Sequence, residues 1–172
     1  GAAGYLLLNQ TNQANWGYNW GRTPGVAINS NFVFTPMQWG NYNWDIGSAS
    51  GPVEQYRSEW KREDKAMYYL GFNEPDGTDQ SNITVDKAME LWLRLERMNM
   101  PLASPVTVNP LNTWMTNFMS QAASQGYRMD AVAAHKYPGP NGGDPSGLIS
   151  ELQTANTTWG RPVWLTEFST VD

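Results

Sequence analysis

From about residue 60 onward, the chain alternates short apolar runs with segments in which apolar residues recur at helical spacing. Short apolar runs bounded by Gly, Pro or polar residues are typical of buried strands, whereas recurrence at every third and fourth position is typical of amphipathic helices. The apolar runs predict strands over residues 66–73, 100–105, 129–137 and 161–168. The helical spacing predicts helices over residues 84–98, 111–126 and 145–156.

Strands and helices alternate in units of about 30 residues, which indicates parallel strands joined by helical crossovers and therefore an α/β fold. The predicted strands are apolar nearly throughout, as expected when both faces of a parallel sheet are covered. Residues 4–9, 14–21 and 29–40 predict three further strands, of which the first has the weakest signal.

The composition narrows the function classes. The chain has 172 residues, a net charge of −5, 40% hydrophobic and 16% charged residues, which is typical of one globular domain, here residues 1–172. The chain has no basic stripe and no apolar run near the roughly 18 residues of a membrane helix, so we expect neither nucleic acid nor membrane as a partner. With no Cys, one His and no H-E-x-x-H motif, we expect no metal and no cofactor.

Aromatic residues are unusually frequent: the chain has nine Trp, eight Tyr and five Phe. In stretches such as NWGYNWG and MQWGNYNW, these aromatics are mixed with Asn, Gln and Gly instead of aliphatic residues. Flat rings flanked by amides suit a ligand with an apolar face and a polar rim, and sugars are such ligands. The alternative is an aromatic-rich core in which the indole N–H groups find partners inside the protein.

Polar or aromatic residues capable of binding or catalysis close five of the predicted strands. In parallel α/β folds, ligands bind at the carboxyl ends of the strands. The coincidence across five strand ends therefore predicts a site built from Asn19, Trp20, Gln38, Trp39, Asn73, Glu74, His135, Tyr137 and Glu167.

Glu74 and Glu167 are the only Glu residues that directly close an apolar strand. Two converging carboxyl groups serve glycoside hydrolysis: one protonates the leaving oxygen, and the other attacks the anomeric carbon or activates water. Mutual repulsion between two close carboxylates raises the pKa of one of them, which keeps the acid protonated near neutral pH. The alternative is that one of them caps a helix or pairs with Lys65 or Lys136. His135, the only His, is interpreted as a strand-end residue that orients a carboxylate and takes no proton itself.

The motifs at these residues resemble a known family. LGFNEPD and PVWLTEF resemble strand-end signatures of retaining glycoside hydrolases of clan A. With NWGYNWG, FTPMQWG, LASPVTV and MDAVAAHKY in the same order, the chain from about residue 14 to 168 resembles glycoside hydrolase family 128, which implies an endo-β-1,3-glucanase on a compact (β/α)8 barrel.

The resemblance also implies roles. Glu74 is then the general acid/base and Glu167 the nucleophile, and Asn73 hydrogen-bonds the sugar 2-OH. Trp20 and Trp39 offer stacking platforms, and His135 and Tyr137 line the cleft. The substrate is then a β-1,3-glucan, and we expect the two carboxyl groups about 5–5.5 Å apart, as in retaining enzymes.

The chain departs from the family pattern in two respects. The family usually has Trp between the His and the Tyr where this chain has Lys136, which puts one sugar subsite in doubt. A full barrel typically takes about 250 residues, and five residues follow Glu167. We therefore expect either a truncated barrel or a barrel that is completed by polypeptide outside this sequence. Alone, these residues would leave an exposed strand edge and would have poor solubility or stability.

We further expect a secreted monomer. Two alternatives remain at this point: another clan A glycanase acting on mannan, xylan or mixed-linkage glucan, and a carbohydrate-binding module without catalysis.

Overall fold

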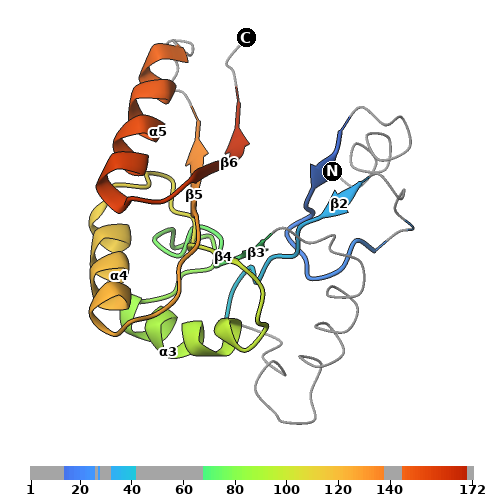
Figure 1. Cartoon of the computed structure of the whole chain (residues 1–172), viewed down its shortest axis with the longest axis horizontal. Helices are drawn as coiled ribbons and strands as arrows, with labels where there is room; N and C mark the ends of the chain where they lie inside the picture. The colour runs from blue at the N-terminus through green and yellow to red at the C-terminus, as the bar shows by residue number, and fades with distance from the viewer. Residues whose placement is uncertain (1–13, 26, 28–31, 42–67, 138–144, 170–172) are drawn as a thin grey trace.

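The computed structural model describes residues 14–25, 27, 32–41, 68–137 and 145–169, and these ranges form an α/β structure (Figure 1). The predicted strand at 4–9 lies outside the described residues. The other predicted elements are confirmed, all of them shorter than predicted except α5, which extends three residues beyond the predicted end. They are β1 (Trp16–Gly17), β2 (Val33–Phe34), β3 (Tyr69–Leu70), α3 (Val85–Glu96), β4 (Leu102–Ala103), α4 (Thr113–Ser124), β5 (Val132–Lys136), α5 (Pro145–Trp159) and β6 (Val163–Phe168).

All strand pairing in the described residues is parallel and follows chain order. The strands pair as β1 with β2, β3 with β4 and β5 with β6. Isolated parallel bridges join these pairs, from Met37 to Leu70 and from Ala103 to Ala131. Helices α3, α4 and α5 lie along one side of β3 to β6 (Figure 1). The strand ends predicted to carry the site therefore point to one edge.

Adjacent strand residues face two different hydrophobic clusters. Tyr69, Leu102 and Val132 belong to the cluster against the helices. Their neighbours Leu70, Ala103 and Ala133 belong to a second cluster on the opposite face. Because both faces are buried, the strands have no polar alternation, which explains why they read as continuous apolar runs.

The helix-side cluster is built around Trp92 of α3. Its ring is fully buried and meets Phe72 and Phe118 edge to face, with centroids 6.2 and 5.3 Å away. Its indole N–H donates to the carbonyl oxygen of Arg128 at 3.0 Å. A Cβ at Gly71 would lie 2.9 Å from this ring and 2.7 Å from the backbone nitrogen of Pro105, so only glycine fits beside it.

Helix starts are defined by the residues that the sequence supplies for them. The Thr84 hydroxyl accepts a hydrogen bond from the backbone N–H of Lys87 at the start of α3, and Asn112 accepts one from Met115 at the start of α4. The Asn112 amide also donates to Asp76 at 2.7 Å, which connects α4 to the loop that follows Glu74.

On the opposite face, aromatic side chains connect the first and last described strands. The ring of Trp164 in β6 lies 5.0 Å from that of Trp16 in β1 and 4.6 Å from that of Tyr68. These contacts bring β1 close to β6, although more than 140 residues separate them in the sequence. None of the described helices is long and apolar enough to cross a bilayer.

Candidate active site

Glu74 lies four residues after the end of β3, and the backbone holds it in an uncommon conformation. Its φ angle is +40°, in the left-handed region that a residue with a Cβ rarely adopts. Its N–H donates to the carbonyl oxygen of Val106 at 2.7 Å, and its own carbonyl accepts from Gly77 at 3.0 Å. The neighbouring Asn73 donates its N–H to Trp39 at 2.9 Å. Strain of this kind persists where surrounding contacts fix it, and it is often found at functional sites.

A bulge in β6 aligns Glu167 with His135. Ala134 pairs with Leu165, but His135 pairs with Glu167, so Thr166 is an extra residue in β6. Such a bulge redirects the side chains that follow it and is common beside active sites. In this case, it places the side chain of Glu167 against the ring of His135.

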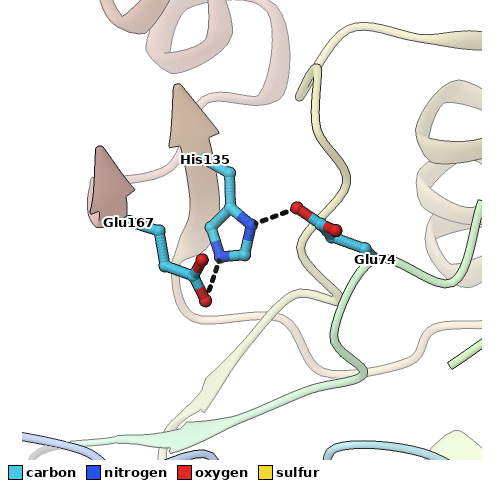
Figure 2. A group of neighbouring side chains, drawn as sticks. All are labelled: Glu74, His135 and Glu167. Atoms are coloured by element: carbon cyan, nitrogen blue, oxygen red, sulfur yellow. Dashed lines mark hydrogen bonds and ion pairs between the residues drawn. The ribbon is translucent and has the colours of Figure 1, made fainter. Parts of the chain in front are cut away.

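His135 lies between the two carboxylates (Figure 2). Its ring is fully buried. Nδ1 is 2.8 Å from Oε1 of Glu74, and Nε2 is 3.2 Å from Oε1 of Glu167, a contact without hydrogen-bond alignment. The hydrogen bond between Nδ1 and Glu74 needs one proton, carried by the ring or by the carboxyl group. A carboxylate oxygen of Glu74 and one of Glu167 lie within 4.8 Å of each other.

Among the described residues, three side chains donate hydrogen bonds to the carboxylate of Glu167. Oε1 accepts from the Tyr18 hydroxyl at 2.9 Å and from the Trp20 indole N–H at 2.6 Å. Oε2 accepts from the Tyr137 hydroxyl. Burial raises the pKa of Glu167, but these hydrogen bonds and the attraction of His135 together outweigh burial, so its pKa lies below the usual value.

The two tyrosines that contact Glu167 are held in their neutral form. Burial, together with the nearby charge of Glu167, raises the pKa of Tyr18, and the same causes raise the pKa of Tyr137. Both hydroxyl groups therefore keep their protons at neutral pH and donate to Glu167.

A pocket of about 500 Å³ opens over the two carboxylates. Trp20 and Tyr137 each expose more than two fifths of their surface at its edge. Asn73 is almost fully buried; its Nδ2 donates to Gln80 at 3.3 Å, and its Oδ1 has no hydrogen-bond partner among the described residues. The pocket is lined by Trp20, Trp39, Asn73, Glu74, Gln80, Val108, Tyr137 and Glu167.

Seven of the nine residues predicted for the site come together here: the six of them that line the pocket, and His135 beneath. The other two do not line the pocket. Asn19 closes a turn, where its amide donates to the carbonyl oxygens of Thr23 and Pro24 at 3.0 and 3.1 Å. Gln38 is buried and donates to the carbonyl oxygen of Gly40 at 2.7 Å. Their predicted sugar contacts remain predictions.

Lys136 lies on the other face of β5 from His135. Its ammonium group pairs with Glu151 of α5, on the helix side of the strands. Neither Glu74 nor Glu167 contacts it, so the structure gives no support to the alternative in which Lys136 neutralises a site carboxylate. Lys65, the other candidate for that pairing, lies outside the described residues. Lys136 is not among the residues that line the pocket.

Tyr18, Gln80 and Val108 belong to the site but were not predicted from the sequence. Tyr18 lies inside NWGYNWG, the stretch that drew attention to Trp20, and its contact with Glu167 spans 149 positions. The alternation of Tyr18 and Trp20 in this stretch could have signalled that both face the same side. Gln80 and Val108 lie in loops, where no periodic signal exists.

Glu74, His135 and Glu167 are also the one group in the described residues whose donor atoms are close enough to consider a metal ion. Metal ligands must converge on one point, at about 2.0–2.2 Å for zinc. The two carboxylates instead approach opposite nitrogens of the imidazole, which separates them across the ring (Figure 2). This arrangement suits proton sharing better than metal binding.

The chain matches known glycoside hydrolases along its length. Residues 2–172 match the family model described as glycosyl hydrolase catalytic core. A curated relative, Alkali-sensitive linkage protein 1 of Schizosaccharomyces pombe, is 29% identical over 90% of this chain and 27% of its own length. The chain therefore spans about a quarter of that relative.

Solved structures agree with the family model. An endo-β-1,3-glucanase of family 128 from Amycolatopsis mediterranei, with a glutamate replaced by alanine and laminaripentaose bound, has a TM-score of 0.78 and 29% identity, over 99% of this chain and 66% of that chain. A curdlan-specific exo-β-1,3-glucanase of the same family from Blastomyces gilchristii, with glucose bound, has a TM-score of 0.74 and 25% identity, over 98% of this chain and 72% of that chain.

Proposed function

The chain belongs to the glycosyl hydrolase catalytic-core family, and from that premise we propose that it is an endo-β-1,3-glucanase that cleaves with retention of configuration. Relatives of family 128 with laminari-oligosaccharides bound support the choice of substrate. The observation that carries the proposal is the convergence of Glu74 and Glu167 on His135 beneath an aromatic pocket.

The distance between the carboxylates supports the retaining mechanism. Retaining enzymes hold the two carboxyl groups about 5–5.5 Å apart, whereas inverting enzymes separate them by about 6.5–9.5 Å to admit a water molecule. One oxygen of Glu74 and one of Glu167 lie within 4.8 Å of each other, which favours the shorter separation of retaining enzymes.

The surroundings of each carboxylate support its role. Glu167 has three donors and a lowered pKa, so it remains charged and suits attack on the anomeric carbon. Glu74 has one side-chain partner among the described residues, a histidine nitrogen that is able to share a proton with it. Glu74 therefore protonates the leaving oxygen, and it later deprotonates the water that releases the sugar from Glu167.

Pocket residues supply the sugar contacts in this proposal. The buried Oδ1 of Asn73 has no partner among the described residues and accepts a hydrogen bond from the 2-OH of the sugar beside the reacting carbon. An unpaired buried acceptor is costly, so substrate binding relieves that cost. Trp39, Trp20 and Tyr137 contact the sugar rings through their exposed faces.

The proposal includes the architecture and setting of the enzyme. The parallel, in-order pairing and the contacts between β1 and β6 support a (β/α)8 barrel of which the described strands form part. A polysaccharide substrate implies a secreted protein, and the proposed catalytic group comes from one chain, which suits a monomer.

The experiment is product analysis with the intact protein. Laminaripentaose is the substrate, and NMR follows the anomeric protons of the first product formed. A β-anomer that appears before mutarotation establishes retention, and internal cleavage of curdlan establishes endo action. An initial α-anomer would contradict the retaining mechanism. If reducing ends are released faster from mannan, xylan or mixed-linkage glucan than from curdlan, the preferred substrate is another β-glycan. Binding to curdlan without any release would leave a carbohydrate-binding module.

A further inference from the structure

We propose that Tyr18 is a positioning residue for this reaction: with Trp20 it occupies Oε1 of Glu167 and thereby selects Oε2 as the attacking oxygen. The inference rests on the proposed function, because it assumes that Glu167 is the nucleophile. It goes beyond that function in assigning a role to a tyrosine and in distinguishing the two oxygens of one carboxylate.

The hydrogen bonds at Glu167 are divided unequally between its two oxygens. Oε1 accepts from Tyr18 at 2.9 Å and Trp20 at 2.6 Å, and Nε2 of His135 lies 3.2 Å away. Oε2 has one donor among the described residues, the hydroxyl of Tyr137. A carboxylate oxygen has two lone pairs. Both lone pairs of Oε1 are therefore used, and one lone pair of Oε2 is free for the sugar.

The Tyr18 hydroxyl is fixed between the nucleophile and the bulge in β6. It lies 2.9 Å from Oε1 of Glu167 and 3.2 Å from the carbonyl oxygen of Thr166, the extra residue of the bulge. One hydroxyl hydrogen serves one of these acceptors, and the charged, nearer carboxylate is the stronger. The ring packs against the second hydrophobic cluster, and its centroid lies 5.3 Å from that of Trp20.

Trp20 reaches the same oxygen through a constrained turn. Its φ angle is +60°, again in the left-handed region. Asn19 fixes this turn, because its Oδ1 accepts from the N–H of Gly21 at 3.0 Å while its amide donates to two carbonyls further on. Asn19, which does not line the pocket, thus acts at a distance by aiming the indole at Glu167.

The covalent step follows from this division. A lone pair on Oε2 forms the bond to the anomeric carbon as the glycosidic carbon–oxygen bond breaks. The electron pair of that bond remains on the leaving oxygen, which takes the proton from Glu74. Oε1 becomes the carbonyl oxygen of the glycosyl ester, and Tyr18 and Trp20 continue to donate to it. Attack through Oε1 would require one of these donors to leave first.

Tyr18 also has a predictable effect on pH dependence. The titratable groups that face Glu167 are Tyr18, Tyr137, His135 and Glu74. Burial, then the charge of Glu167, raises the pKa of Tyr18, so Tyr18 does not itself titrate near neutrality. Its hydrogen bond lowers the pKa of Glu167, and its removal raises that pKa. The acidic limb of activity therefore moves to higher pH when the hydroxyl is removed.

The test compares Tyr18→Phe with Tyr68→Phe in the intact protein. Tyr68 packs against the same cluster and loses the same hydroxyl group, but it does not contact Glu167. For Tyr18→Phe, we expect the apparent pKa of the acidic limb of kcat/KM to increase by about one unit, because a hydrogen bond to a charged group is lost. We expect kcat to fall about tenfold with KM nearly unchanged, because Tyr18 does not line the pocket. Tyr68→Phe should change none of these.

A trapped intermediate tests which oxygen attacks. A 2-deoxy-2-fluoro-glucosyl donor of the β-1,3 series is used to form a stable ester on Glu167, and its crystal structure locates the bond. An ester through the oxygen that faces Tyr137 supports the proposal. An ester through the oxygen that faces Tyr18 overturns it, as does an unshifted acidic limb in Tyr18→Phe when wild type is active. If the wild-type protein releases no sugar and forms no ester, the proposed function fails instead.

Discussion

The two carboxylates of the site are held by different means. Glu74 is fixed by its backbone: φ is +40°, the N–H and carbonyl are both hydrogen-bonded, and the carboxylate has one side-chain partner among the described residues, His135. Glu167 lies in a regular strand after a bulge, and three donated hydrogen bonds fix its carboxylate.

This difference separates the roles of two chemically identical side chains. Hydrogen bonds to a carboxylate stabilise its charged form, so the side chain with three donors remains ionised. A single partner that is able to give or take a proton suits a group that exchanges protons during the reaction. The comparison therefore supports the proposed roles, with attack by Glu167 and proton transfer by Glu74.

The largest expected effect comes from removal of each carboxylate in turn. Glu167→Ala should lower kcat by roughly four to six orders of magnitude, because without the nucleophile no covalent intermediate forms. Added azide should restore turnover through the vacated space and give the α-glycosyl azide. Glu74→Ala, tested with a substrate whose leaving group needs no acid, should give the β-glycosyl azide instead. A β-glycosyl azide from Glu167→Ala and an α-glycosyl azide from Glu74→Ala would show that the proposed roles of the two residues are reversed.

The next effect comes from His135, which connects the two carboxylates. His135→Ala should reduce kcat/KM by about 10²-fold or more, because the proton shared with Glu74 loses its partner. The melting temperature should fall more at pH 7 than at pH 4, since two facing carboxylates repel most when both are charged. Activity and calorimetry across pH check both effects. Retention of full activity would show that the ring only fills space.

A smaller effect concerns stability and the lowered pKa of Glu167. A carboxyl group whose pKa is lower in the folded protein stabilises the fold above its usual value of 4.5, and this contribution is lost as pH falls through the lowered folded value. The difference in melting temperature between wild type and Glu167→Gln should therefore be constant above about pH 6 and narrow below pH 4.5.

Glu90→Gln is the matched control for this measurement. A hydrogen bond from Lys87 lowers the pKa of Glu90, as the donors to Glu167 lower the pKa of that residue. The pair of Lys87 and Glu90, however, is exposed on the surface of α3. Solvent screening makes such pairs contribute little. A difference in melting temperature that stays flat from pH 7 to pH 3 for Glu167→Gln would contradict the inference that three hydrogen bonds lower the pKa of Glu167.

The smallest effect tests the strained backbone at Glu74. Asn adopts the left-handed region more readily than other residues with a Cβ, whereas Gln keeps the length of Glu and removes its charge. Both variants lose the ionised carboxylate, and Asn also lacks one methylene group of a largely buried side chain, which works against the gain expected from its backbone preference. Glu74→Asn should be more stable than Glu74→Gln by about 1 kcal/mol in urea unfolding with equal m-values. Equal stabilities would show that the cost of the φ angle of +40° is no larger than the loss of packing from the shorter side chain.

The sequence by itself determined the strands and helices of the described residues and the order in which they occur. Apolar runs and helical spacing depend on neighbours within a few residues, so the β3, α3, β4, α4, β5, α5 and β6 segments could be predicted with errors only at their ends. The strand-end rule also selected Glu74, Glu167 and His135, because parallel strands bring their carboxyl ends to one edge.

Only the tertiary structure decided which contacts these residues make. Tyr18 and Trp20 meet Glu167 across nearly 150 positions, and no local pattern specifies such a pairing. The bulge at Thr166 and the left-handed backbone at Glu74 are set by hydrogen bonds from neighbouring strands. Asn19 and Gln38 also close predicted strands, but their side-chain amides donate hydrogen bonds to nearby backbone carbonyl oxygens. A sequence specifies which side chains reach an edge, whereas packing of distant segments decides which of them remain available to a substrate.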